Sequence, residues 1–279
     1  YTSGMLLGFG TMNSICLGGM LAMSSTTIII KVFDELKIKE KYTELVFGTL
    51  VIQDIVGIFM MVILSTISAR QNISGVEIMG SLLLMVLYLI IWLVFGIYLL
   101  PTFFNKTIKL MNDEMLLVVS IGICFGMVLL ADNLGFSTAL GSFLAGSLLA
   151  GTVHVERVET LTKGVKDLFG AVFFISVGMM VQPEMIAKYI IPIVVIILVT
   201  LVGKLVFNSI GMLLSGQSLP NAVSSGFALA QIGEFAFIIA SFGINLGIID
   251  EYIYPIVVAV SVITTFTTPF CIKAAPIFV

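Results

Sequence analysis

The sequence predicts an all-α membrane protein, a polytopic helical bundle, and three observations predict it. Of the 279 residues, 59% are hydrophobic and only 10% are charged. A soluble domain carries about 25% charged residues. The mean hydropathy is +1.19. The apolar residues form long continuous runs between short charged loops, and such runs are helices in lipid because each backbone group must be paired within its own segment.

The apolar runs predict about nine or ten membrane segments, because a helix needs about 20 apolar residues to cross the hydrocarbon core. A β-barrel would need alternating segments of about ten residues, and these runs do not alternate. We treat 1–279 as one transmembrane domain, the later part of a longer chain whose earlier helices are absent. The segments are placed at 1–12 (the tail of one helix), 14–32, 43–67, 78–100, 115–132, 136–152, 165–182, 188–213, 221–242 and 253–275.

The cations predict the orientation of the segments, because cytoplasmic loops are enriched in Lys and Arg. If the segments alternate, ten cations fall on one side, two on the other, and Lys204 lies inside a span. The ten are Lys31, Lys37, Lys39, Lys41, Lys106, Lys109, Arg157, Lys163, Lys166 and Lys273, and the two are Arg70 and Lys188. This bias places the loop at 31–41 and the C-terminus in the cytoplasm of a multi-pass cell-membrane protein, with a bacterial inner membrane favoured.

The charge distribution argues against nucleic acid as a partner, and the cysteine spacing argues against redox or metal chemistry. There is no basic patch, so we expect membrane lipid and no nucleic acid as surroundings. Cys16, Cys124 and Cys271 stand alone in apolar runs without a CxxC spacing, so we expect small apolar packing rather than redox or metal chemistry. No cofactor is expected.

Asp54 is the first candidate functional residue. Gln53 and Asp54 stand side by side within the apolar run at 43–67. A carboxylate in a membrane span is costly unless it faces protein or water, and it marks a functional site by default. The alternative is a neutral, hydrogen-bonded structural aspartate.

Four adjacent hydroxyl residues interrupt the run at 14–32, namely Ser24, Ser25, Thr26 and Thr27. Ser and Thr compete with helical hydrogen bonds through their side chains. A break in the helix is expected here but not compelled, because no Pro or Gly lies among the four. The alternative is an unbroken helix with the hydroxyls bonded back to the preceding turn.

Lys204 and the stretch around Glu234 interrupt two further spans. Lys204 is too deep to reach the membrane surface easily, so its partner is a carboxylate or the carbonyl end of a broken helix, unless it is neutral or purely structural. Gln231 lies between Gly226 and Gly233, and Glu234 directly follows Gly233. Glycine weakens a helix, so we expect a discontinuous span here, with Glu234 favoured as a structural residue over an ion ligand or proton carrier.

The order of these interruptions mirrors itself along the chain. The hydroxyl stretch comes just before the span of Asp54, and the Glu234 stretch comes just after the span of Lys204. Two interrupted spans in different halves indicate a secondary transporter with inverted-topology repeats and a site near the bilayer midplane. We therefore expect two crossed discontinuous helices and a core site built from 14–67 and 188–242.

Five stretches resemble one family in register over nearly the whole chain, the cation:proton antiporter-2 family and within it the Kef-type potassium/proton antiporters. They are 22–27 (AMSSTT), 51–55 (VIQDI), 135–146 (GFSTALGSFLAG), 173–179 (FFISVGM) and 231–237 (QIGEFAF). The resemblance implies a sodium/proton-antiporter-like fold, alternating access and a homodimer. Kef-type proteins usually continue into a cytoplasmic nucleotide-binding regulatory domain, and the sequence at hand neither includes such a domain nor allows it to be inferred.

The resemblance implies roles for two residues. The aspartate at the position of Asp54 binds the cation and the proton in turn, and the lysine at the position of Lys204 supports the site. Sodium-selective relatives with charge-moving transport usually carry two acidic residues where this chain has Gln53 and Asp54. This departure favours electroneutral exchange and K⁺ over Na⁺, without deciding the ion.

Our hypothesis is therefore a secondary active antiporter and not an enzyme. A monovalent cation at Asp54, with Gln53 and the hydroxyls of Ser24 to Thr27 as further ligands, would displace a proton. Gln231, Gly233 and Glu234 form a second, discontinuous-helix part of the site, and Lys204 supplies a supporting charge. The alternatives are a proton-coupled carrier of organic solutes and a passive cation channel, for which no filter motif is present. An intramembrane aspartyl protease would need a second deep aspartate.

Overall fold

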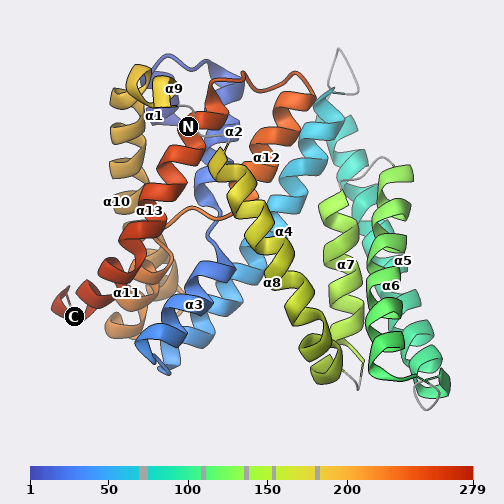
Figure 1. Ribbon diagram of the computed structural model, residues 1–279. Helices are drawn as coiled ribbons and strands as arrows, with labels where there is room; N and C mark the ends of the chain where they lie inside the picture. The colour runs from blue at the N-terminus through green and yellow to red at the C-terminus, as the bar shows by residue number, and fades with distance from the viewer. Residues whose placement is uncertain (69–74, 108–110, 135–137, 153–154, 180–182, 279) are drawn as a thin grey trace. The chain divides into compact units, whose positions relative to one another are not determined.

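The computed structural model describes residues 1–68, 75–107, 111–134, 138–152, 155–179 and 183–278 (Figure 1). Over these residues the chain forms helices and no strand, which confirms the predicted fold class. Arg70, Lys109 and the first three residues of the stretch at 135–146 lie outside the described residues. The elements are α1 Thr2–Leu6, α2 Thr11–Ala22, α3 Thr26–Leu36, α4 Lys41–Ser68, α5 Gly75–Thr107, α6 Asp113–Asn133, α7 Thr138–Ala150, α8 Val155–Met179, α9 Pro183–Lys188, α10 Ile190–Leu214, α11 Leu219–Ala228, α12 Phe235–Asn245, α13 Ile253–Ala274 and the 3-10 turn η2 Ala275–Phe278.

Five stretches of the described residues are long and apolar enough to cross a membrane. They are Thr11–Leu36, Lys41–Ser68, Asp113–Asn133, Ile190–Leu214 and Ile253–Phe278, and two shorter apolar helices run over Leu140–Ala150 and Phe235–Asn245. The chain is thus a multi-pass membrane protein. The count of nine or ten segments stays a prediction.

Some predicted boundaries differ from the structure for local reasons. Residues 1–12 are not the tail of one helix, because α1 ends at Leu6 and the chain turns at Gly8 and Gly10 before α2 begins. Both glycines have positive φ, 78° and 76°, a conformation that costs glycine little. Helix α8 begins ten residues before the predicted 165, at Val155. Its first turns carry charged residues, which hydropathy alone assigns to a loop.

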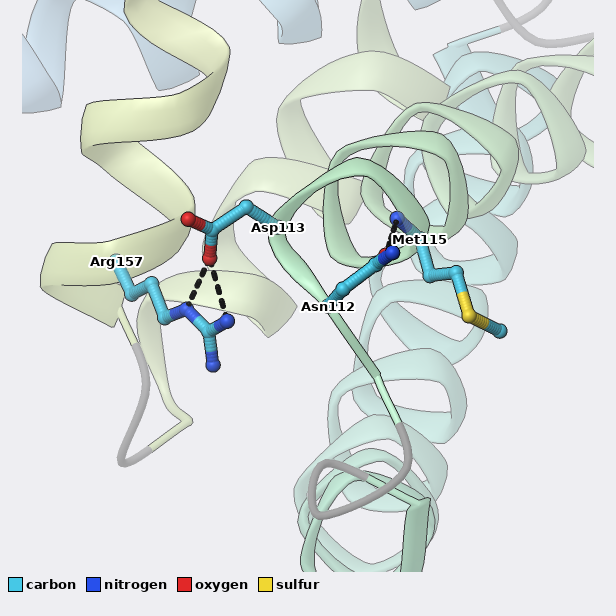
Figure 2. Close-up of polar contacts among 4 residues, drawn as sticks. All are labelled: Asn112, Asp113, Met115 and Arg157. Carbon is cyan, nitrogen blue, oxygen red and sulfur yellow. Dashed lines mark hydrogen bonds and ion pairs between the residues drawn. The ribbon is translucent and has the colours of Figure 1, made fainter.

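The described chain divides into two compact units. Unit 2 covers 61–177 and holds the end of α4, helices α5 to α7 and nearly all of α8. Figure 2 shows how the start of α6 is fixed within it. The side chain of Asn112 accepts a hydrogen bond from the backbone N–H of Met115 at 2.8 Å, an N-cap. Arg157 of α8 donates to Asp113 through both Nε and Nη2, so the first turns of α6 and α8 are tied together.

Unit 1 covers 1–60 and 178–279 and holds every candidate site residue. Its buried cluster joins the α3–α4 hairpin to the end of α13 and to the end of α11. The members are Ile29, Val32, Phe33, Tyr42, Val46, Leu50, Ala228, Leu229 and Ile272. Because Ile272 packs among residues of the hairpin, the loop at 37–41 and the last turn of α13 lie at the same end of this unit. That is the arrangement the cation bias predicts for these two segments.

Candidate cation site

The hydroxyl stretch is a true interruption of the helix. Helix α2 ends at Ala22, and α3 begins at Thr26. Met23 and Ser25 between them have extended backbones, with ψ of 132° and 117°. Ser25 caps the new helix, because its side chain accepts a hydrogen bond from the backbone N–H of Ile28 at 3.2 Å. The serine therefore bonds forward into α3 and not back into the preceding turn.

The glycine stretch is the second interruption. Helix α11 ends at Ala228, and α12 begins at Phe235, with non-helical backbone between them. Two hydroxyls of α13 support this segment. The backbone N–H of Ile232 donates to Thr264 Oγ1 at 3.3 Å, and Ser261 Oγ donates to the Ile232 carbonyl at 3.2 Å. Backbone groups freed by a break in a span need such partners. Nothing in the sequence pattern singled out Ser261 or Thr264.

The two interruptions bond directly to each other. The backbone N–H of Gly233 donates to the carbonyl of Met23 at 3.0 Å. Ser24 Oγ donates to the carbonyl of Leu229 at 3.1 Å. Gln231 Nε2 donates to the carbonyl of Ser25 at 3.3 Å. Segments about 200 residues apart in the sequence thus satisfy each other's backbone groups, which explains why Ser24 and Gln231 are buried.

Gly233 is the point of closest approach between the two interruptions. A Cβ at this position would overlap the carbonyl of Ser24, and it would lie 2.7 Å from the backbone nitrogen of Ser25. Cβ atoms do not come that close to backbone atoms. Only glycine therefore lets the interruptions meet, and the reason is space and not φ, since Gly233 does not have a positive φ.

Lys204 joins both interruptions through its ammonium group. Nζ lies 3.2 Å from the carbonyl oxygen of Ala22, 3.0 Å from that of Met23 and 2.8 Å from that of Gln231. It also lies 2.8 Å from Ser24 Oγ. Of the two predicted kinds of partner, the carbonyl end of a broken helix is the one present. The carbonyl end of a helix carries partial negative charge, so a cation is favoured there.

We call the place where the two interruptions, 23–25 and 229–234, bond to each other the junction. Helix α4 lies against this junction through Gln53 and Gly57. Gln53 Oε1 accepts a hydrogen bond from the backbone N–H of Ser24 at 2.9 Å. An added Cβ at Gly57 would lie 3.2 Å from the Phe235 ring and 3.3 Å from the sulfur of Met23. Gln53 therefore fixes α4 to the first interruption, and Gly57 lets α4 approach both.

Asp54 is half-buried on the same helix. Among the described residues its carboxylate accepts no hydrogen bond and forms no ion pair, with Lys204 or with any other cation. Asp54 is thus a carboxylate in an apolar helix without a fixed protein partner in the part of the chain that the structure describes.

Glu234 stands directly before α12, where the amide end of a helix favours negative charge. Its Oε1 accepts a hydrogen bond from Thr27 Oγ1 of α3 at 3.2 Å. Its Oε2 is buried, and no hydrogen-bond partner for it exists among the described residues. Lys204 lies at carbonyl ends and Glu234 at amide ends, so each places a full charge where the broken helices leave the opposite partial charge.

The structure uses most of the predicted ligand oxygens for its own bonds. Ser24 Oγ, Ser25 Oγ, Thr27 Oγ1 and Gln53 Oε1 each bond to protein. The hydroxyl of Thr26 makes no hydrogen bond within the described residues. In this arrangement these side chains shape the junction, and the carboxylates of Asp54 and Glu234 keep unpaired oxygens.

Comparison with known proteins identifies the family. The family described as sodium/hydrogen exchanger, transmembrane, matches residues 1–274. The chain belongs to this sodium/hydrogen exchanger family. The match includes both interruptions, Asp54 and Lys204, so the features assembled above lie inside the family's transmembrane region.

Three relatives show how closely this exchanger-family chain resembles named proteins. It is 27% identical to K(+) efflux antiporter 4 of Arabidopsis thaliana, over 97% of this chain and 47% of the relative. It is 26% identical to a Na(+)/H(+) antiporter of Enterococcus hirae, over 93% and 68%. It is 30% identical to the iron transporter MagA of Paramagnetospirillum magneticum, over 95% and 61%. The chain thus spans about half the length of the Arabidopsis relative, and the three names differ in the cation.

Proposed function

We propose that this chain exchanges a monovalent cation, K⁺ in preference to Na⁺, for H⁺ by alternating access, with Asp54 as the exchange point. The supporting observation is the unpaired carboxylate of Asp54 on a helix that Gln53 fixes to a broken one. Antiport is also the activity in the names of the potassium and sodium relatives.

The mechanism follows from the free-energy cost of an ionised Asp54 that has neither a proton nor a cation bound. An ionised aspartate in the middle of a span costs about 2.5–3.5 kcal/mol even on the lower scale. The empty, charged site is therefore disfavoured, and the site changes sides with either a proton or a cation on Asp54. Because only one of the two can occupy the carboxylate, inward movement of one is coupled to outward movement of the other.

Lys204 and Glu234 do not exchange ions in this proposal. Lys204 is occupied by oxygens of both interruptions, so it stabilises the junction and does not neutralise Asp54. Glu234 keeps an oxygen without a hydrogen-bond partner among the described residues, and this oxygen supports a bound cation. One carboxylate then carries one cation or one proton.

The proposal is tested by cation-driven proton flux in proteoliposomes that contain a pH-sensitive dye. The purified chain is challenged with K⁺, Na⁺, Rb⁺, Li⁺ and Fe²⁺ at several pH values. Asp54→Asn, which keeps the shape and removes the exchangeable charge, is expected to reduce flux to the rate of protein-free liposomes. The control is Asp132→Asn, at an exposed carboxylate near the end of α6. Flux at the wild-type rate in Asp54→Asn would overturn the proposal.

Electroneutrality is tested separately with an imposed membrane potential. Exchange of one cation for one proton moves no net charge, so the initial rate of K⁺-driven exchange is expected to stay the same when gradients of the permeant anion thiocyanate set the potential. A rate that changes steeply with potential contradicts one-for-one exchange. Flux of cation without any proton movement would instead indicate a channel.

A further inference from the structure

The start of α2 is bonded to the loop between α12 and α13 through Asn13. The side chain of Asn13 is buried, with 7% exposed. Its Nδ2 donates to the carbonyl of Phe9 at 2.9 Å and to Asp250 Oδ2 at 2.6 Å. Its Oδ1 accepts a hydrogen bond from the backbone N–H of Asp250 at 3.0 Å. Asn13 therefore holds Asp250 through the backbone as well as through the carboxylate.

Aromatic rings extend this contact to the start of α10. The ring of Tyr252 packs edge-on against Phe9, and it stacks on the ring of Tyr189, with centroids 5.6 Å apart in both pairs. The hydroxyl of Tyr252 lies 3.2 Å from Asn13 Nδ2. Tyr189 directly precedes α10. We call this group, Phe9, Asn13, Tyr189, Asp250 and Tyr252, the Asn13 clasp, and all of it belongs to unit 1.

The clasp and the junction hold the same three elements at two different points. At the junction, Met23 at the end of α2 is bonded to Gly233 before α12 and to Lys204 of α10. At the clasp, the start of α2 contacts the loop after α12 and the residue before α10. Ten residues of helix separate Asn13 from Met23, a length of about 15 Å. Helices joined at one point can pivot about it, whereas a second contact at this distance also fixes the angle between them.

The carbonyl end of α2 is the part of the junction that depends most on this angle. Lys204 bonds to the carbonyl of Met23 there, and Gln53 of α4 accepts a hydrogen bond from the backbone N–H of Ser24. Because Gln53 directly precedes Asp54, a change in the angle of α2 also changes the position of α4 at Asp54. The clasp contains none of the candidate ion ligands, so its effect on the ion passes through α2.

We propose that Asn13 is a positioning residue for exchange. By fixing the start of α2 to the α12–α13 loop, it keeps the carbonyl end of α2 and the bonded part of α4 in the geometry that binds the cation. The inference rests on the proposed function, because it concerns the cation that is exchanged for the proton. Loss of the clasp weakens cation binding without stopping the site from changing sides. The half-saturating K⁺ concentration then rises, while the maximum rate changes little.

A charge swap tests this role in K⁺-driven proton flux in proteoliposomes. Asn13→Asp places a second carboxylate against Asp250, and two ionised carboxylates at hydrogen-bond distance repel each other. When Asn13→Asp is combined with Asp250→Asn, the carboxylate at 13 can accept hydrogen bonds from the backbone N–H and the side-chain amide at 250. We expect the half-saturating K⁺ concentration to rise at least about threefold in Asn13→Asp, a small coupling for residues in one hydrogen-bond network. It should return close to the wild-type value in the combined variant.

Two further variants separate the contact from the added charge. Asn245→Asp is the matched control, because it adds the same charge at an exposed position at the end of α12, and it should leave the half-saturating concentration unchanged. Asn13→Leu removes the hydrogen bonds of the clasp without adding a charge, so it should raise that concentration, and Asp250→Asn should not correct it. Asn13→Leu also keeps the test open if Asn13→Asp does not fold. Rates are compared per amount of folded protein, and thermal unfolding in detergent is measured for each variant.

Several results would overturn the positioning role. One is a wild-type half-saturating concentration in both Asn13 variants, and another is no recovery in the combined variant. A lower maximum rate at an unchanged half-saturating concentration, or loss of folded protein in both Asn13 variants, would mean that the clasp only stabilises the fold. Failure of the proposed function is seen separately. If Asp54→Asn exchanges at the wild-type rate, Asp54 is not the exchange point, whereas the clasp variants leave Asp54 in place and report on the cation affinity itself.

Discussion

Lys204 connects the parts of the junction through its ammonium group. It bonds to oxygens of Ala22, Met23, Ser24 and Gln231, so one side chain satisfies carbonyls of both interruptions. Removing a hydrogen-bond partner so that buried acceptors are left unsatisfied costs about 1–3 kcal/mol. From the position of the ammonium we infer that the first role of Lys204 is to stabilise the junction, and that any role in transport is secondary.

Lys204→Met should therefore lose stability, because it keeps the apolar stem and removes the ammonium. We expect a loss of about 1–3 kcal/mol in thermal or denaturant unfolding of the detergent-solubilised chain. Lys163→Met, at an exposed lysine of α8, is the control and should change stability by less than about 0.5 kcal/mol. If Lys204→Met has wild-type stability but altered exchange, the lysine acts on the transported ion and does not stabilise the junction.

Sequence reasoning finds the charged residues and misses their partners. Asp54 and Lys204 stand out because a charge in an apolar run is costly whatever surrounds it. The partners of Lys204 could not be chosen in advance, since they come from 22–24 and 231, far away in the sequence. Ser261 and Thr264 were missed because an isolated hydroxyl in a span gives no sign of whether it supports a distant backbone group.

At the scale of elements, the two interruptions form for different reasons. Glycines weaken the helix around Gln231, so this break could be expected from local sequence alone. The break at Ser24 was expected without being compelled, and the structure shows what completes it. Gln53, Leu229 and Lys204 bond to Ser24 from three other segments. A tertiary cause of this kind cannot be seen in a local sequence pattern.

Gly233→Ala tests the close approach of these two elements. Its Cβ would overlap the backbone around Ser24, which cannot move as a flexible side chain could. We expect a loss of at least about 1–3 kcal/mol, the usual cost of overpacking, and a matching loss of exchange. Gly211→Ala on α10 meets no atom within 4 Å and should gain up to about 1 kcal/mol, because alanine favours the helix. Similar behaviour of the two variants in unfolding experiments would show that the interruptions can separate without cost.

At the scale of the whole molecule, the charge pattern and unit 1 agree on one point. The loop at 37–41 and the end of α13 meet in one buried cluster, as the cation bias requires for two segments on the same side. The number of membrane segments could be estimated from sequence only by assuming continuous spans. A broken span counts as one crossing but appears as two helices, so helix counting and crossing counting differ in this fold.

The side on which this end lies can be measured with single cysteines. Cys16, Cys124 and Cys271 are first replaced by alanine, and Lys39→Cys, Ala274→Cys and Lys188→Cys are then made one at a time. Because cations are enriched in cytoplasmic loops, we expect a membrane-impermeant maleimide to label Lys39→Cys and Ala274→Cys only in inside-out vesicles. Lys188→Cys, exposed at the end of α9, should be labelled only in right-side-out vesicles. Labelling of Lys39→Cys and Lys188→Cys from the same side would mean that an even number of crossings separates them, and the predicted segments between 43 and 182 would then have to be redrawn.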